Sequence, residues 1–173
     1  MELTDFWSIV EDSAREGTDP DERAARIAAS LAALSDEDLI AFQGHFDDQM
    51  DRLGGDLVWK AAALIRNGCG DDSFSRFRAW VIGLGREAVD RVVADPDHLA
   101  ERPEIQRLAG RDDSEWADDE WPDWEEFEFA AVNEYERRHG AVALPRGERA
   151  VTPEGEDREL PRLDAMFPDS GPL

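Results

Sequence analysis

Residues 35–55 read SDEDLIAFQGHFDDQMDRLGG, and this stretch decides the fold class. Its large apolar side chains recur at steps of three or four residues: Leu39, Phe42, Phe46, Met50 and Leu53. This spacing places them on one stripe of a helix. Ser35 precedes three acidic residues, which is typical of a helix N-cap and first turn, and Gly54 and Gly55 end the pattern. The stretch therefore predicts a long amphipathic helix.

Helical spacing continues through most of the chain, and no run of four or more residues alternates as a half-buried strand would. Asp19-Pro20-Asp21-Glu22 supplies an N-cap, a proline at the first helical position and an acidic first turn, so it predicts another helix start. Gly83 and Gly85 interrupt a helix predicted from about Asp71, and the chain either continues through them or breaks tightly there. We predict an all-α fold with a single domain of six to eight helices over residues 1–140.

The end of this domain and the segment after it differ in composition. A last helix is predicted from about Pro122 to Gly140, with inward-facing Trp124, Phe127, Ala131 and Tyr135 and largely outward-facing Glu125, Glu126, Glu128, Glu134 and Glu136. Residues 141–173 hold five of the nine prolines and show almost no periodicity. They predict an irregular C-terminal tail that is extended or partly packed through Leu160, Leu163, Met166 and Phe167.

The charge balance limits the classes of partner. The chain has 42 acidic residues against 19 Lys and Arg, which gives a net charge of −23. This field repels phosphate backbones and anionic lipids, so we expect neither direct nucleic-acid binding nor membrane attachment. No apolar run approaches the roughly 20 residues that span a bilayer, and residues 1–5 do not resemble a signal peptide. A single cysteine, Cys69, excludes an internal disulfide, and we expect a cytoplasmic protein.

Acidic residues concentrate in one part of the sequence. Between Asp112 and Glu136 lie twelve acidic residues, no Lys or Arg, and three of the six tryptophans. A run of like charge is usually a solvated face. The functional alternative is a surface that docks a basic protein, formed by Glu115, Trp116, Asp118, Asp119, Glu120 and Trp121, with the two indoles as anchors. A weaker alternative is divalent-cation binding by the same carboxylates.

The block WKAAALIRNGCGDDSFSRFRAW at residues 59–80, followed by Gly85-Arg-Glu and Asp95-Pro-Asp, resembles a bacterial family of unknown function, DUF4240. The resemblance covers roughly residues 1–140. That family has no assigned activity, so the resemblance implies a location and not a chemistry. A site shared by its members would gather around six residues: Cys69, Asp71, Asp72, Arg76, Arg78 and Trp80.

Each member of this candidate ligand site also has an ordinary structural explanation. Cys69 lies between two glycines before a helix start, where it is either a nucleophile or a small buried residue. Asp71 and Asp72 are oxygen donors for a hard cation, or a cap and first turn of the helix. Arg76 and Arg78 suit a carboxylate or phosphate ligand, although Asp72 and Arg76 are spaced as a local ion pair, which we prefer.

No metal or cofactor is predicted. His45, His98 and His139 are far apart in the sequence, and none has a second His or Cys at metal-ligand spacing. Our leading hypothesis is a non-enzymatic interaction module that binds a basic partner through the acidic, Trp-rich region. The alternative is a small-molecule or metal-dependent enzyme with its site at residues 69–78. The sequence does not determine an oligomeric state.

Overall fold

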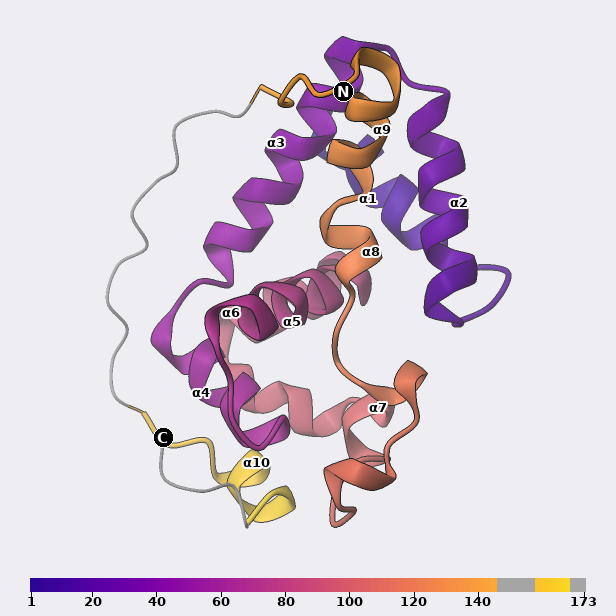
Figure 1. Ribbon diagram of the computed structural model, residues 1–173. Coiled ribbons are helices and arrows are strands. Elements are labelled where there is room, and N and C mark those ends of the chain that lie inside the picture. Colours follow the sequence, from indigo (N-terminus) through magenta and orange to yellow (C-terminus); the bar gives the residue numbers. More distant parts are fainter. Residues whose placement is uncertain (146–157, 169–173) are drawn as a thin grey trace.

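The computed structural model describes residues 1–145 and 158–168, which are helical and contain no strand (Figure 1). Within these ranges seven longer helices form the framework: α1 (Leu3–Asp12), α2 (Pro20–Ala32), α3 (Asp36–Arg52), α4 (Asp56–Ile65), α5 (Asp71–Gly83), α6 (Arg86–Ala94) and α9 (Ala130–His139). Six short helices complete it: the 3₁₀ turns η1 (Pro96–Glu101), η2 (Asp113–Glu115) and η3 (Asp118–Glu120), and α7 (Pro103–Gln106), α8 (Glu125–Glu128) and α10 (Pro161–Met166). The all-α prediction is confirmed. None of the helices described is long and apolar enough to cross a bilayer.

Local signals in the sequence set several helix ends. The Ser35 hydroxyl accepts a hydrogen bond from the backbone N–H of Asp38, and the Asp19 carboxylate accepts one from Glu22. Both caps satisfy amides that a helix start leaves without partners. After α5 the chain breaks at Gly85, whose φ of 100° is readily adopted only by glycine. Of the two alternatives at this point, the structure has the tight break.

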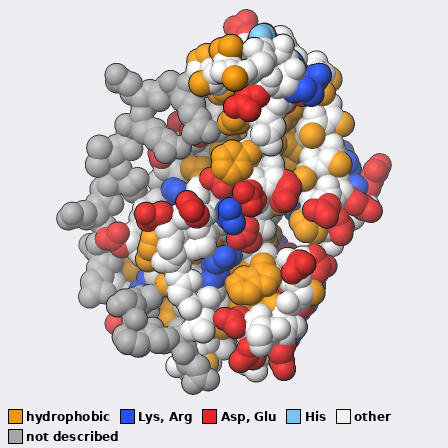
Figure 2. All heavy atoms as spheres, viewed as in Figure 1, with side chains coloured by type: hydrophobic (Ala, Val, Ile, Leu, Met, Phe, Trp, Pro, Cys, Tyr) orange, Lys and Arg blue, Asp and Glu red, His pale blue; other side chains and the backbone are white. Residues whose placement is uncertain are grey.

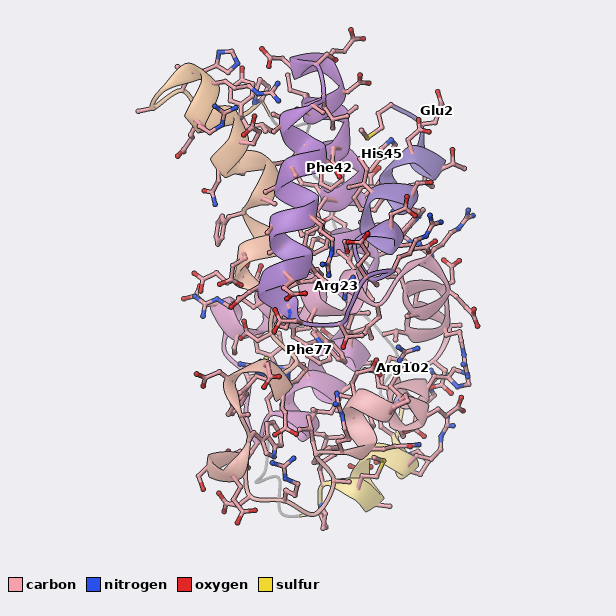
Figure 3. The ribbon with its side chains drawn as sticks, turned by 90° about the vertical axis from the view of Figure 1, so that its right-hand side faces the viewer. Glu2, Arg23, Phe42, His45, Phe77 and Arg102 are labelled. Carbon is pink, nitrogen blue, oxygen red and sulfur yellow. The ribbon has the colours of Figure 1, made fainter. Side chains whose placement is uncertain are left out.

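The helices pack in two groups that meet at α5 (Figure 1). In the upper group α9 packs against α2 and α3, and in the lower group η1 packs against α4, α6 and α10. Phe6, Phe42, Phe77 and Phe127 are among the largest completely buried side chains of the core. Figure 3 shows Arg23 at the lower end of α2, from which its guanidinium reaches the Gly83 carbonyl of α5. The fold is therefore one continuous core with α5 at its centre.

Gly83 allows α8 to approach α5 closely. A Cβ atom at position 83 would lie 2.4 Å from Cζ3 and 2.5 Å from Cε3 of Trp124. The guanidinium of Arg23 lies 4.6 Å from the centroid of the Trp124 ring and donates a 2.7 Å hydrogen bond to the Gly83 carbonyl. Trp124 is only 3% exposed, as its predicted core position requires. A side chain at position 83 would occupy the space that this ring fills.

The predicted last helix is wrong in two respects. The chain forms two helices, α8 and α9, separated at Phe129, whose ring is exposed. Glu134 was expected to face outward but is only 8% exposed. Its carboxylate accepts hydrogen bonds from Arg137 and Arg138, and these bonds lower its pKa to about 2. A buried carboxylate is tolerated here because it is paired with cations.

Arg138 connects this carboxylate to the end of α2. Its guanidinium donates hydrogen bonds of 2.9 Å to the carbonyls of Leu31 and Leu34 and one of 3.2 Å to that of Ala32. The last carbonyls of a helix have no partner within the helix and carry its negative dipole end. Glu134 and Arg138 therefore join α9 to α2 by capping it from outside.

Segment 158–168 closes the lower group of helices. Leu160 and Leu163 are completely buried, and Met166 and Phe167 pack against the core. The buried carboxylate of Asp97 in η1 accepts 3.1 Å and 3.0 Å hydrogen bonds from the backbone N–H groups of Arg162 and Leu163 at the start of α10. The remainder of the predicted tail, residues 146–157 and 169–173, lies outside the described residues. The boundary at residue 140 stays a prediction.

Candidate functional site

The six residues of the predicted ligand site lie in α5 and just before it, but the structure does not make them converge. Arg76 pairs with Glu125 of α8, with 3.1 Å between Nη2 and Oε1. The prediction of a local Asp72–Arg76 pair is therefore wrong. Asp71 and Asp72 are exposed in the first turn of α5, where carboxylates favour the positive end of the helix dipole.

Gly70, and neither aspartate, is the N-cap of α5. The Ser73 hydroxyl accepts a 2.9 Å hydrogen bond from the Gly70 N–H and so satisfies one amide of the helix start. Cys69 is half-buried, with its Sγ 3.6 Å from the Ser73 hydroxyl oxygen. The thiol contacts the neutral Ser73 hydroxyl and lies 3.7 Å from the Gly70 carbonyl oxygen, and general-base activation of a nucleophile would need a base in place of these groups.

The remaining two residues turn toward other elements. Arg78 stacks over the Phe74 ring at 4.6 Å and donates a 3.0 Å hydrogen bond to the Met50 carbonyl of α3. Trp80 is half-buried beside Phe77, with 5.8 Å between the ring centroids. These contacts connect α5 to its neighbours in the core. They give the enzyme alternative no converging set of reactive groups.

The acidic loop, residues 112–120, is held in shape by Arg111. Its guanidinium binds both carboxylate oxygens of Glu120 at 2.8 Å and 2.9 Å and donates a 2.7 Å hydrogen bond to the Glu115 carbonyl. The bonds from Arg111 lower the pKa of Glu120 to about 2. A guanidinium bound in this forked manner fixes geometry as well as charge. Glu120 is consequently engaged inside the protein, although the sequence placed it on a partner surface.

The two tryptophans of the predicted partner surface differ in exposure. Trp116 is 8% exposed and packs against Trp121 with 4.8 Å between ring centroids. Trp121 is half-buried, and the guanidinium of Arg66 lies 5.3 Å from its ring centroid. The sequence leaves the exposure of Trp116 open, and the structure shows that its ring is buried. Its ring fills the space beneath the acidic loop.

Five carboxylates of the acidic loop form no ion pair with another described residue: Asp112, Asp113, Glu115, Asp118 and Asp119. Asp113 is half-buried and the other four are exposed. Acidic side chains are prominent in the lower right of Figure 2, where Figure 1 places this segment of the chain.

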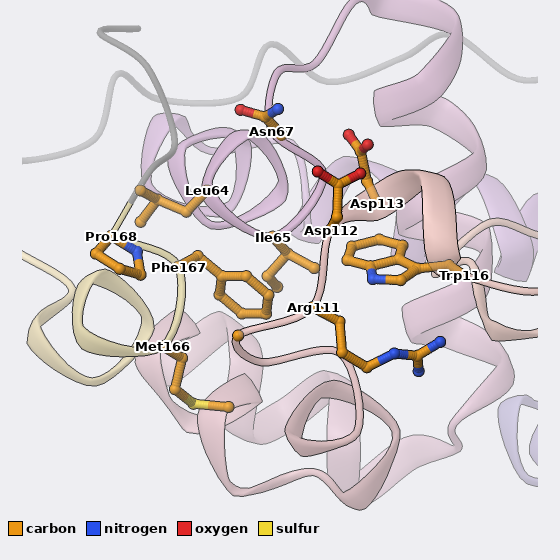
Figure 4. A pocket seen from close by; sticks show the side chains of 11 residues that line it. Leu64, Ile65, Asn67, Arg111, Asp112, Asp113, Trp116, Met166, Phe167 and Pro168 are labelled. Carbon is orange, nitrogen blue, oxygen red and sulfur yellow. The ribbon is translucent and has the colours of Figure 1, made fainter.

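A cavity of about 370 Å³ lies beside the acidic loop (Figure 4). It lies between the end of α4, the start of the loop and the end of α10. One side of its lining is apolar and consists of Leu64, Ile65, Met166, Phe167 and Pro168. The other side is mostly polar and consists of Asn67, Gly110, Arg111, Asp112, Asp113 and Trp116. Sequence reasoning missed this cavity because three segments far apart in the chain form it. The packing of Met166 and Phe167, which was predicted, was the only signal.

A second, more open hollow of about 520 Å³ lies along the surface of α6. It is lined by Glu11, Arg86, Glu87, Asp90, Arg91, Ala94 and His98. Arg162, His98 and Arg91 all bind Glu101 and lower its pKa to about 2. Arg86 lies near Asp90, with 3.8 Å between the charged atoms. Most charges at this hollow are therefore compensated within the protein.

Comparisons with known proteins identify a family but no activity. The family model described as "Protein of unknown function (DUF4240)" matches residues 1–137. No curated protein and no solved structure matches the chain. In the part of the chain that the structure describes, no group of three or more His, Cys, Asp or Glu residues is arranged to hold a metal ion.

Proposed function

We infer that this protein, which belongs to the DUF4240 family of proteins of unknown function, is a cytoplasmic, non-enzymatic interaction module. In this proposal the acidic loop binds a basic macromolecular partner. The observation that carries the proposal is a set of five carboxylates that pair with no cation among the described residues, all within eight residues of a loop whose shape is fixed from inside.

The distribution of ion pairs supports this choice of surface. Three of the six acidic residues between the loop and Gly140 pair with a cation: Asp123 with Arg66 at 3.2 Å, Glu125 with Arg76, and Glu134 with Arg137 and Arg138. Among the described residues, the loop therefore carries more unpaired carboxylates than the segment that follows it. A fixed set of like charges attracts an opposite surface over a Debye length of roughly 8 to 10 Å and speeds association with it.

The rigidity of the loop also favours binding. Arg111 holds the loop at its Glu115 carbonyl and its Glu120 carboxylate, and the buried Trp116 ring lies beneath it. A surface that is already ordered loses little conformational entropy when a partner binds. The charge of the loop selects Lys-rich and Arg-rich proteins and opposes nucleic acids and anionic membranes.

Charge reversal at the loop tests the proposal. A fluorescein-labelled octalysine peptide is expected to bind the wild-type protein at low salt and to dissociate as salt is raised, because exposed charges are screened. The double variant Asp118→Lys/Asp119→Lys should bind it about tenfold more weakly, measured by fluorescence anisotropy. Both side chains are exposed, so thermal unfolding should change little.

The matched control is the double variant Glu16→Lys/Asp48→Lys. It changes the net charge by the same amount at two exposed positions on other elements. If it weakens octalysine binding as much as the loop variant does, the peptide senses only the net charge and the proposal fails. Binding that is indifferent to salt would contradict the proposal equally.

A further inference from the structure

The cavity beside the acidic loop contains a hydrogen-bond donor without a partner. Trp116 is more than nine-tenths buried, and no described residue places an acceptor within hydrogen-bond distance of its indole Nε1. Figure 4 shows this indole reaching into the space between Ile65 and Arg111. A buried donor without an acceptor is energetically unfavourable, and a ligand that supplies the acceptor would remove this penalty. The cavity therefore suits a ligand with a carbonyl or similar oxygen.

The same feature at Trp124 does not indicate a site. Its Nε1 also lacks a partner, but its ring is enclosed by Gly83 on one side and Arg23 on the other. Trp116, in contrast, lines a cavity of about 370 Å³. That volume is at the lower end of the range of about 300–1,000 Å³ for ligand pockets, and it accommodates one long side chain and adjoining backbone.

The electrostatics of the cavity favour a cationic ligand. Arg111 contributes a guanidinium to the lining, but Glu120 neutralises it through two short hydrogen bonds. Asp112 and Asp113 lie side by side at the polar edge of the cavity (Figure 4). Asp112 accepts hydrogen bonds from Ser114, which lower its pKa, and neither Asp112 nor Asp113 forms an ion pair with another described residue. Two carboxylates thus face one end of a cavity whose other charge is already compensated.

The opposite wall requires a ligand with an apolar stem. Ile65 and Phe167 line this wall together with Leu64, Met166 and Pro168. A lysine side chain combines a flexible apolar stem of four methylene groups with a compact ammonium group. Its own peptide backbone supplies a carbonyl close to the stem. The carbonyl of such a residue matches the indole donor of Trp116, and its stem matches the apolar wall. Its ammonium group matches the carboxylates of Asp112 and Asp113.

We propose that this cavity receives a lysine side chain of the basic partner. The ammonium lies at Asp112 and Asp113, the methylene stem lies along Ile65 and Phe167, and an adjacent backbone carbonyl accepts the Nε1–H of Trp116. This inference rests on the proposed function, because it names the group that the partner inserts beside the acidic loop.

Indole NMR of the ¹⁵N-labelled protein tests the proposal directly. The Trp116→Phe variant identifies the Trp116 indole N–H signal among the six by its loss. Titration with Nα-acetyl-lysine N-methylamide should move this signal downfield, because a new acceptor lengthens and polarises the N–H bond. Nα-acetyl-norleucine N-methylamide, which lacks the ammonium, should bind at least about fivefold more weakly. Hexylamine, which lacks the carbonyl, should give no downfield shift.

A pair of variants locates the ammonium. Asp113→Asn should weaken binding of the lysine probe about fivefold, because it removes a charge at the cavity. The matched variant Glu115→Gln removes one charge from the loop outside the cavity and should leave the affinity for the probe unchanged. Equal binding of the lysine and norleucine probes, or the absence of any Trp116 shift, would overturn the inference.

These results separate the inference from the proposed function. If octalysine binds in an Asp118- and Asp119-dependent manner while the lysine probe leaves Trp116 unaffected, the proposed function stands and the cavity proposal fails. If the lysine probe binds at Trp116 but octalysine does not depend on the loop, the proposal of a basic macromolecular partner fails. The site then binds free alkylammonium compounds that carry a carbonyl.

Discussion

The Gly83→Ala variant is expected to lose about 3 kcal/mol of its free energy of unfolding. The added methyl carbon would lie 2.4 Å and 2.5 Å from two carbons of the Trp124 ring, distances that real carbon contacts do not reach. The ring cannot move aside easily, since Arg23 covers it and Phe127 packs beside it with 4.7 Å between centroids. Urea unfolding followed by tryptophan fluorescence measures the change. The α5–α8 contact should be the part that is disrupted.

Gly44 provides the matched control. It lies in the middle of α3, is exposed, and has no atom within 4 Å of the position that a Cβ would take. Gly44→Ala should therefore stabilise the protein by about 0.5–1 kcal/mol, because alanine has the higher helix propensity. The two variants make the same chemical change with opposite expected signs. A loss of stability at both positions, or at neither, would contradict the packing described for Trp124.

The second large effect is expected at Glu134. Glu134→Gln should lower the free energy of unfolding by about 2–3 kcal/mol at pH 7, because it removes the buried charge that holds Arg137 and Arg138. The folded-state pKa of Glu134 is about 2, below its ordinary value of 4.5. The stabilising contribution is therefore complete above about pH 5 and is lost as the pH falls toward 2.

The pH dependence distinguishes this explanation from a general loss of packing. The difference between wild type and Glu134→Gln should shrink as urea unfolding is repeated from pH 7 to pH 3, since below about pH 5 the carboxylate is protonated in the unfolded state before it is protonated in the folded state. Glu136→Gln, at an exposed position of the same helix, should stay within about 0.5 kcal/mol of wild type throughout. A difference at Glu134 that stays constant with pH would show that the ion pairs are not its origin.

Helix starts could be predicted from sequence where the signal is local. Ser35 and Asp19 act on amides three residues away, so the sequence around each contains the whole interaction. The end of the domain could not be predicted in this manner. The backbone of Trp124 is not helical, with φ −147° and ψ 76°, and its N–H bonds to the Arg76 carbonyl of α5, so the helix begins at Glu125 and not at Pro122 as predicted. Contacts across the core override local preference there.

The candidate sites show the same difference between features that depend on local sequence and features that depend on contacts across the fold. Arg76 has an acidic residue four positions before it, but its actual partner, Glu125, is brought near by the fold. Trp116 lies in an irregular segment without helical periodicity, so no pattern indicated whether its ring was buried. The acidic charge of the loop, in contrast, could be read directly, because charge is a property of composition. The cavity could not be predicted from the sequence, since its walls come from three segments that are distant in the chain.

The carboxylate of Asp97 has a consequence for how the protein opens. It holds the first amides of α10 from a position 65 residues earlier in the chain, with both side-chain oxygens engaged. Those amides can exchange their hydrogens with solvent only when α10 leaves η1, and Leu160 and Leu163 must leave the core with it. The exchange rates at Arg162 and Leu163 therefore report the cooperative opening of the lower half of the fold, and not the fraying of a chain end.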